Sequence, residues 1–245
     1  MGAAGEVRIL DQRTAAERDR PFLPGMGRTW LLPLYDVSSR LSGDRALHTR
    51  AVALAGVAPG QAVLDVGCGT GNLALTVLAA APDARVTGLD PDGAALRRAA
   101  RKARHRGVSL TLVQGYADRL PAEDASLDHV LSSLAVHHLE DGRPGFAREA
   151  FRVLRPGGTI TIVDFGGPEP ATPAEHSAHG HGKAHALRHL TGLVRARVAG
   201  VAGVPHSLGD ALPTLLADAG FEDAREVDHV EHRQGRISFV QATRA

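Results

Sequence analysis

The sequence predicts an α/β fold built on one mostly parallel sheet, and three observations carry this prediction. Short apolar runs alternate with helical patterns from residue 61 to residue 165. Strands that alternate with helices form right-handed βαβ units, whose strands lie parallel. The chain has 245 residues, of which 43% are hydrophobic, so it can bury a sizeable core.

The elements follow in order from apolar runs and from the residues that end them. Pro82 stops the first helix of the alternating region, and Gly107 and Gly220 stand where a helix C-terminal glycine is expected. The expected strands cover 61–66, 85–89, 108–113, 127–134 and 159–165, followed by 222–232 and 236–243 as a terminal hairpin. The expected helices cover 72–81, 93–106, 143–154 and 208–219, with two short helical patterns between 30 and 56.

The ends of the chain and one long interval do not follow this pattern. Residues 1–28 hold several charges and then Pro21 and Pro24, so we expect a poorly ordered, flexible N-terminal tail. We expect residues 29–245 to form a single domain. Within it, residues 166–207 interrupt the alternation and are predicted to form a helical cap over the site.

The composition excludes several classes of protein. The 28 Lys and Arg residues nearly balance the 27 Asp and Glu residues, and only 4% of residues are aromatic, so we expect no nucleic-acid partner. A single cysteine excludes a disulfide framework and a cysteine-rich metal centre. The sequence lacks both a long apolar run and a signal-like N-terminus, which predicts a cytoplasmic protein without integral membrane association.

A glycine-rich turn follows the first expected strand. It reads Gly67-Cys68-Gly69-Thr70-Gly71 and leads directly into a helix. Strand, glycine turn and helix together form a nucleotide-type site, because glycines admit a ligand to the backbone and the helix N–H groups face it. Asn72 stands where the dinucleotide fingerprint needs glycine, and no Gly-Lys-Ser/Thr follows, which excludes a P-loop.

Asp90 ends the second expected strand, 25 residues after Asp65. A carboxylate at this place can accept hydrogen bonds from both hydroxyls of a ribose. Its alternative role is that of a helix N-cap, which Asp92 can supply instead. The ribose role is therefore favoured.

Five candidate residues fall independently at the carboxyl ends of five expected strands. This edge of an open α/β sheet is where ligands bind. The five residues are Asp65, Asp90, Tyr116, Ser133 and Asp164.

The sequence resembles the class I S-adenosylmethionine-dependent methyltransferases, in the branch that includes the ubiquinone/menaquinone C-methyltransferases. The resemblance runs from about residue 35 to residue 243. It rests on four motifs: Leu64-Asp65-Val66-Gly67-Cys68-Gly69-Thr70-Gly71, Gly88-Leu89-Asp90, residues 120–128 (LPAEDASLD) and residues 152–158 (RVLRPGG). It implies a seven-stranded, mostly parallel Rossmann-like sheet with an antiparallel C-terminal edge strand, and S-adenosyl-L-methionine as cofactor, which leaves as S-adenosyl-L-homocysteine.

The resemblance also assigns cofactor contacts near the glycine turn. Gly67 and Gly69, in the turn that Gly71 completes, should hold the methionine moiety. Asp65 should orient the turn and help to bind the amino group. Ser132 and Ser133 end the fourth strand beside the expected sulfonium.

At the other end of the cofactor, Asp90 should hold the ribose and Pro91 should lie against the adenine. The family usually has an acid where this chain has Tyr116. Asp118 can substitute for that acid, or Tyr116 can stack or donate from its hydroxyl, and Ala117 still offers its backbone N–H. Tyr35 is either a lid over the cofactor or a core residue.

Methyl transfer from a sulfonium mainly requires that the acceptor be aligned, and a base is needed only if the acceptor loses a proton. His137 is the first candidate for this base, ahead of His138, and Asp164 is a second candidate whose alternative role is to cap a loop. Cys68 has no visible partner, so we interpret it as a packed residue and not as a nucleophile.

Five histidines lie between 176 and 189, inside the expected cap. They can form a solvated lid, line an acceptor pocket, or bind a metal ion, and we predict no metal site because no cysteine or carboxylate cluster supports one.

The predicted function is methyl transfer to a small-molecule acceptor, with C- or O-methylation favoured. Two alternatives remain: a cofactor-binding protein with a non-methylating or regulatory role, and a nicotinamide-dependent oxidoreductase, against which Asn72 speaks.

Overall fold

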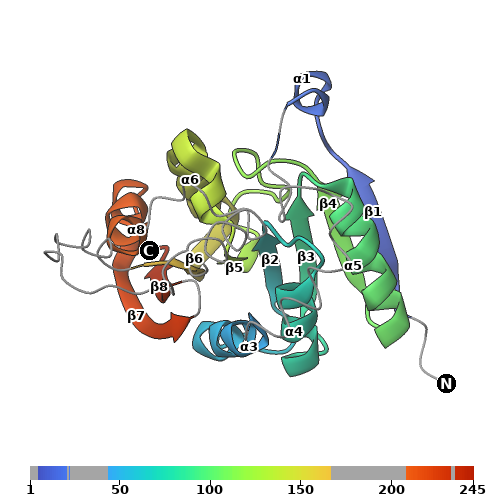
Figure 1. The fold of residues 1–245 in the computed structure, drawn as a ribbon, viewed down its shortest axis with the longest axis horizontal. Coiled ribbons are helices and arrows are strands. Elements are labelled where there is room, and N and C mark those ends of the chain that lie inside the picture. The colour runs from blue at the N-terminus through green and yellow to red at the C-terminus, as the bar shows by residue number, and fades with distance from the viewer. Residues whose placement is uncertain (1–4, 21, 23–43, 167–207, 233–234) are drawn as a thin grey trace, which may run out of the picture.

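The computed structural model describes residues 5–20, 22, 44–166, 208–232 and 235–245, which form one sheet with helices on both faces (Figure 1). The strands are β1 (Val7–Asp11), β2 (Ala62–Val66), β3 (Arg85–Asp90), β4 (Leu110–Gln114), β5 (Leu127–Ser133), β6 (Leu154–Phe165), β7 (Glu222–His232) and β8 (Gly235–Thr243). The helices are α1 (Ala15–Arg18), α3 (Asp44–Ala55), α4 (Asn72–Ala80), α5 (Gly93–Arg106), α6 (Arg143–Val153) and α8 (Leu208–Asp218), together with a 3₁₀ segment at Val136–Gly142.

The sheet has the strand order β1-β4-β3-β2-β5-β6-β8-β7. The strands from β1 to β6 pair in parallel. β8 runs antiparallel to β6, and β7 pairs antiparallel with β8, as expected for the terminal hairpin. The predicted α/β class and mostly parallel sheet are thus confirmed. The predicted count of seven strands is wrong, because the described sheet has eight.

The additional strand is β1, which lies within the residues expected to form a tail. It pairs in register with β4, from Val7 opposite Leu110 to Asp11 opposite Gln114. In Figure 1 it is the dark blue arrow at the edge of the sheet, beside β4. A single run of five residues between charged positions gives a weak strand signal, and its partner lies about a hundred residues further along the chain.

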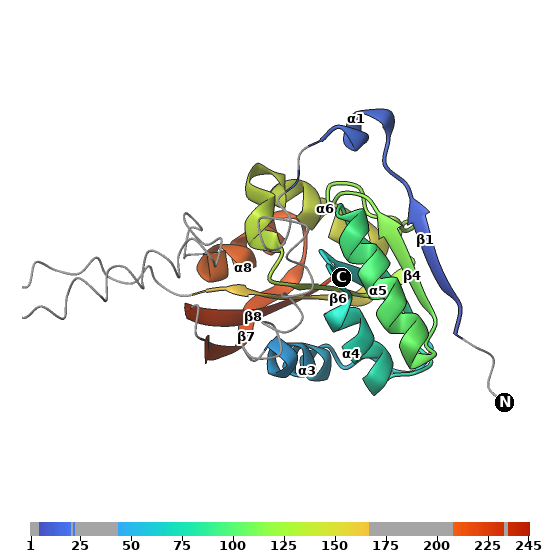
Figure 2. The same cartoon turned by 45° about the vertical axis from the view of Figure 1, so that its right-hand side comes forward.

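Two apolar layers enclose the sheet, because successive strand residues point to opposite faces. Val63 belongs to the layer under α3, α4 and α5, whereas its neighbour Leu64 belongs to the layer under α6 and α8. Figure 2 shows these two groups of helices on opposite sides of the strands. The parallel strands are therefore covered on both faces, and their carboxyl ends carry the polar residues.

The helix ends next to these strands are set by local sequence. Gly71 precedes α4 with a φ of 76°, a left-handed conformation that glycine adopts without strain. Asp92 is the N-cap of α5, and its side chain accepts hydrogen bonds from the N–H groups of Ala94 and Ala95. Asp92 thus fills the capping role that was the alternative for Asp90.

Several predictions fall on segments outside the described residues. They include Tyr35, the first of the two short helical patterns, the histidines from 176 to 189, and the expected cap apart from Gly166. Within the described ranges, no helix is both long and apolar enough to cross a membrane.

Candidate functional site

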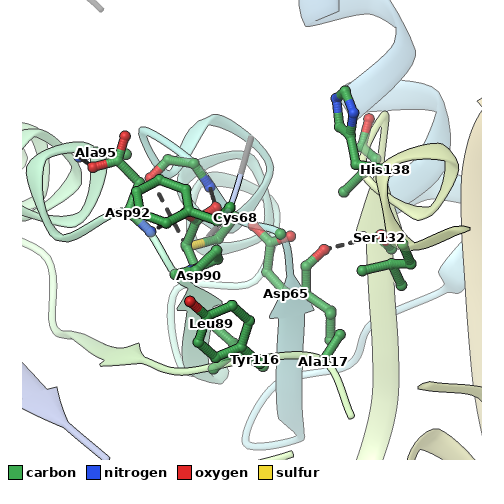
Figure 3. A pocket seen from close by; sticks show the side chains of 18 of the residues that line it. Asp65, Cys68, Leu89, Asp90, Asp92, Ala95, Tyr116, Ala117, Ser132 and His138 are labelled. Atoms are coloured by element: carbon green, nitrogen blue, oxygen red, sulfur yellow. Dashed lines mark hydrogen bonds between the residues drawn. The ribbon is translucent and has the colours of Figure 1, made fainter. Parts of the chain in front are cut away.

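A cavity of about 250 Å³ lies at the carboxyl ends of the central strands. Its walls come from the glycine turn after β2, from the ends of β3, β4 and β5, and from the 3₁₀ segment. In Figure 3, Asp65, Cys68 and Asp90 lie between Asp92 on one side and His138 on the other. The sequence analysis predicted the ligand-binding residues at this same edge of the sheet.

Asp90 fixes the glycine turn from the neighbouring strand. One carboxylate oxygen accepts a hydrogen bond from the Gly69 N–H at 2.8 Å, and the other accepts from the Asp92 N–H at 2.8 Å. Burial raises the pKa of Asp90 to about 6, although these two hydrogen bonds favour the charged form. Each oxygen keeps a further lone pair, so Asp90 can also accept hydrogen bonds from a ligand.

Asp65 is buried at the end of β2 and lines the same cavity. One of its oxygens accepts from the Ala74 N–H in the first turn of α4 at 3.0 Å. Burial, with a smaller contribution from the nearby Asp90, raises the pKa of Asp65 to about 7. Both carboxyl groups would therefore ionise more readily beside a cationic ligand.

The three glycines of the turn have different roles. Gly67 and Gly69 line the cavity. Gly67 has a φ of 72°, and a Cβ at this residue would lie 2.3 Å from the Cβ of Ala135. Gly71 is not among the lining residues, and a Cβ there would meet the Cβ of Ala99 on α5 at 2.9 Å. Gly71 therefore allows α4 and α5 to pack closely.

Two buried polar atoms of the cavity lack a hydrogen-bond partner in the part of the chain that the structure describes. They are Oδ2 of Asp92 and Oγ of Ser133, and both residues line the cavity. By contrast, the adjacent Ser132 donates from its hydroxyl to the Val66 carbonyl at 2.9 Å. Buried polar atoms are normally paired, so these two are exceptions among the described residues, and protein atoms cover both of them.

The end of β4 is contacted by the N-terminal segment. Tyr116 donates from its hydroxyl to the Arg20 carbonyl at 2.7 Å, and the Arg20 guanidinium lies 4.4 Å from the centre of the Tyr116 ring. Burial raises the pKa of Tyr116 above its usual value, so its hydroxyl stays protonated. Ala117 and Asp118 complete this wall, and Pro91 faces the same cavity from the end of β3.

The two predicted catalytic residues contact each other. Nδ1 of His137 lies 2.7 Å from Oδ1 of Asp164, and the His137 N–H donates to Oδ2 at 3.1 Å. Both side chains are buried, and neither residue is among the lining residues. His138 lines the cavity instead, with its ring centre 3.9 Å from that of His137.

The His138 ring lines the cavity, and the residue is exposed to solvent. Partial desolvation by the surrounding atoms, together with the neighbouring His137, lowers the pKa of His138 to about 4. The imidazole is therefore neutral near pH 7 and able to accept a proton.

Sequence reasoning missed Arg20 and also missed His48, a buried residue of α3 that lines the cavity beside Thr70 and Asn72. Burial lowers the pKa of His48 to about 4, so it is neutral as well. No motif surrounds either residue, so only the folded chain reveals them. Cys68 is buried, and desolvation raises the pKa of its thiol well above the usual value, which suits a packed residue.

Comparison with known proteins gives the family. The model of a methyltransferase domain matches residues 63–158. A demethylmenaquinone methyltransferase of Thermus thermophilus is 31% identical over 199 residues, which are 78% of this chain and 89% of that protein. The chain belongs to the class I S-adenosylmethionine-dependent methyltransferases. It falls in the branch of the ubiquinone/menaquinone C-methyltransferases.

One further relative agrees with this family assignment, and one solved structure agrees with the fold. A ubiquinone/menaquinone biosynthesis C-methyltransferase of Syntrophotalea carbinolica is 29% identical over 83% of this chain and 85% of its own. A crystal structure of an S-adenosylmethionine-dependent methyltransferase from Aquifex aeolicus has the same fold, with a TM-score of 0.58 and 19% identity over 89% of this chain and 99% of that one.

The methyltransferase therefore uses S-adenosyl-L-methionine and acts on a small molecule. The comparisons do not favour the non-methylating and oxidoreductase alternatives.

Proposed function

We propose that the cavity binds S-adenosyl-L-methionine along the carboxyl ends of β2 to β5, and that the acceptor enters on the side of His138. In this arrangement, the backbone of Gly67 and Gly69 contacts the methionine moiety and Asp65 contacts its amino group. The buried carboxylates support this assignment, because a cationic sulfonium and ammonium compensate for the cost of ionising them.

The nucleoside part lies toward the ends of β3 and β4 in this proposal. Asp90 accepts from the ribose hydroxyls with its remaining lone pairs, while Pro91 and Tyr116 flank the adenine. Ala117 offers its backbone N–H to the ring. The family's usual acid at this position is Tyr116 in this chain. Asp118 does not take over its role, because Asp118 forms an ion pair with Arg20 at 2.6 Å. The Tyr116 ring instead contacts the adenine by stacking.

The observation that carries the proposal is the pair of carboxyl groups at the ends of β2 and β3. Asp65 is buried, Asp90 is partly buried, and both line the cavity beside the glycine turn. Backbone N–H groups hold one oxygen of Asp65 and both oxygens of Asp90 in place. A ligand with a cationic group near Asp65 and hydroxyl groups near Asp90 suits both carboxyl groups, as an amino-acid–nucleoside conjugate does.

The cofactor supplies an already activated methyl group, so the chain's main task is to align the acceptor behind it. His138 is neutral and faces the cavity, and it takes the proton that a carbon or oxygen acceptor loses. The buried Asp164–His137 pair holds the backbone of the 3₁₀ segment and the ring next to His138. It acts as a positioning pair, because neither residue lines the cavity.

We propose C- or O-methylation of a lipophilic small molecule. The names of the two relatives support a quinone-like acceptor class. The presence of a neutral imidazole also favours acceptors that must be deprotonated, in contrast to neutral amines. The near-zero net charge and the scarcity of aromatic residues support a small molecule over a nucleic acid.

The test follows a labelled methyl group into a product. Purified protein is incubated with methyl-labelled S-adenosylmethionine and a fractionated extract of the cells that encode it. The proposal expects label in one organic-soluble fraction, loss of label with Asp90→Ala, and retention with Asp83→Ala, which removes an exposed carboxylate elsewhere. Label that appears only in protein or nucleic acid would overturn the proposed acceptor class.

A further inference from the structure

The N-terminal strap, residues 5–20, runs along the edge of the sheet and ends at the cofactor cavity. Its first part is β1, which pairs with β4 over five residues. The pairing continues beyond the strand, because the Gln12 N–H donates to the Gln114 carbonyl at 3.1 Å. The strap therefore approaches the site on the side where β4 ends. Figure 1 shows α1 above the end of β4.

Arg119 fixes the middle of the strap. Its guanidinium donates to the Gln12 carbonyl at 2.6 Å and to the Glu17 carboxylate at 2.7 Å. Glu17 in turn accepts from the Thr14 N–H, which closes a capping box around α1. Because Arg119 follows the site residues Tyr116 and Asp118, the strap and this wall of the cavity share one network.

The last residue of the strap contacts the cavity wall in three ways. The Arg20 carbonyl accepts from the buried Tyr116 hydroxyl, its guanidinium covers the Tyr116 ring, and it forms an ion pair with Asp118 at 2.6 Å. The side chains of Arg20 and Asp118 are 43% and 40% exposed, so the ion pair itself contributes little. The contact with Tyr116 carries the attachment, because it combines a hydrogen bond to the Arg20 carbonyl with the guanidinium stacked over the ring.

Arg20 also lines the cofactor cavity together with Tyr116. We propose that the strap is part of the cofactor site: Arg20 and Tyr116 form the wall against which the purine of the cofactor lies, and cofactor binding and strap docking stabilise each other. Guanidinium and phenol groups both present flat faces suited to a purine. The coupling must be reciprocal, because each partner binds better to the form that the other stabilises. This inference rests on the adenine position proposed above.

Binding of S-adenosylhomocysteine, measured by titration calorimetry, tests the first half of the proposal. We expect Arg20→Ala and Tyr116→Phe to weaken binding by about 3- to 30-fold, the range given by losing one cation–π contact or one buried hydrogen bond. The matched control is Arg8→Ala, which removes the same charge from β1 at a residue that bonds only to the exposed Glu6 among the described contacts. Affinities of both variants within twofold of wild type would overturn the proposal.

Limited trypsin digestion tests the second half. The strap contains cleavable bonds after Arg13 and Arg18. We expect saturating S-adenosylhomocysteine to slow both cuts severalfold in wild type and in Arg8→Ala, and to have little effect in Arg20→Ala. Equal protection of wild type and Arg20→Ala would overturn the coupling.

The two proposals fail in different ways. If wild type binds S-adenosylhomocysteine and Asp90→Ala does not, but Arg20→Ala binds normally, the cofactor site stands and the role of the strap is refuted. If wild type itself does not bind, the proposed site fails and the strap inference fails with it. Circular dichroism and thermal unfolding of each variant distinguish loss of folding from loss of the contact.

Discussion

The two ends of the cavity hold their ionisable groups in opposite ways. At the proposed cofactor end, the buried Asp65 and the partly buried Asp90 accept backbone hydrogen bonds, and burial raises their pKa values to about 7 and about 6. At the proposed acceptor end, His138 has its pKa lowered to about 4, while its neighbour His137 contacts the buried Asp164. The first arrangement favours a ligand that brings positive charge. The second keeps the imidazole neutral near pH 7.

The largest expected effect is a loss of affinity for the cofactor when Asp90 is removed. Asp90→Ala leaves the N–H groups of Gly69 and Asp92 without the acceptor that now fixes the turn. We expect S-adenosylhomocysteine to bind about 100-fold more weakly, since the ribose hydroxyls lose their proposed acceptor and the glycine turn loses the side chain that positions it. Calorimetry with Asp83→Ala as control measures this. A loss of less than threefold would contradict the role of Asp90.

The next effect is on the free energy of unfolding, and it compares alanine substitutions at two glycines that share a left-handed conformation. Gly67 and Gly60 have φ values of 72° and 79°, but only at Gly67 would a Cβ clash, at 2.3 Å from Ala135. At Gly60, a Cβ meets nothing within 4 Å among the described residues. We expect Gly60→Ala to lower the free energy of unfolding by about 1–2 kcal/mol. Gly67→Ala should cost about 2 kcal/mol more, because the core must also shift. Urea denaturation of both variants checks this, and equal losses would be inconsistent with it.

The opposite pKa shifts predict opposite pH dependences. The folded pKa of Asp65 lies above its unfolded value of 3.8, so its contribution to stability is present below that value and is lost as the pH rises through about 7. Asp65→Asn should therefore remove a slope of up to about 1.4 kcal/mol per pH unit between pH 4 and 7 in the ligand-free protein.

For His138 the sign is reversed. Its folded pKa lies below the usual 6.5, so stability is present above that value and is lost as the pH falls toward about 4. His138→Asn should flatten this fall. Unfolding measured from pH 4 to pH 8 in both variants gives the two signs, and slopes of the same sign would refute the contrast between the two ends.

The smallest expected effect on cofactor affinity is that of a change at the proposed acceptor end. His138→Ala should change the affinity for S-adenosylhomocysteine by less than about twofold, because the proposed cofactor contacts lie on the other side of Asp65. Transfer of labelled methyl to the acceptor fraction should fall by about 100-fold or more if His138 takes the proton. His105→Ala, which alters an exposed histidine of α5, is the matched control.

The two ends of the cavity also differ in how well the sequence predicts them. The glycine turn, Asp65 and Asp90 form a local pattern of strand, turn and helix, so their places could be inferred from neighbouring residues. His137 and His138 are adjacent in a 3₁₀ segment that the sequence did not predict, and which of the two faces the cavity depends on the burial of Asp164 at the end of another strand. Arg20, His48 and β1 reach the site or the sheet through distant contacts, and no local pattern encodes these.

The pairing of β1 with β4 also has a consequence for the order in which the chain folds. The Glu6 N–H donates to the Ser109 hydroxyl, 103 positions later in the sequence. During synthesis at about 5–20 residues per second, β1 leaves the ribosome several seconds or more before its partner strand exists. Closing so long a loop is costly in entropy until the central strands have formed. We therefore expect β1 to dock late, so that the cavity wall at Tyr116 is completed only after the central strands have folded.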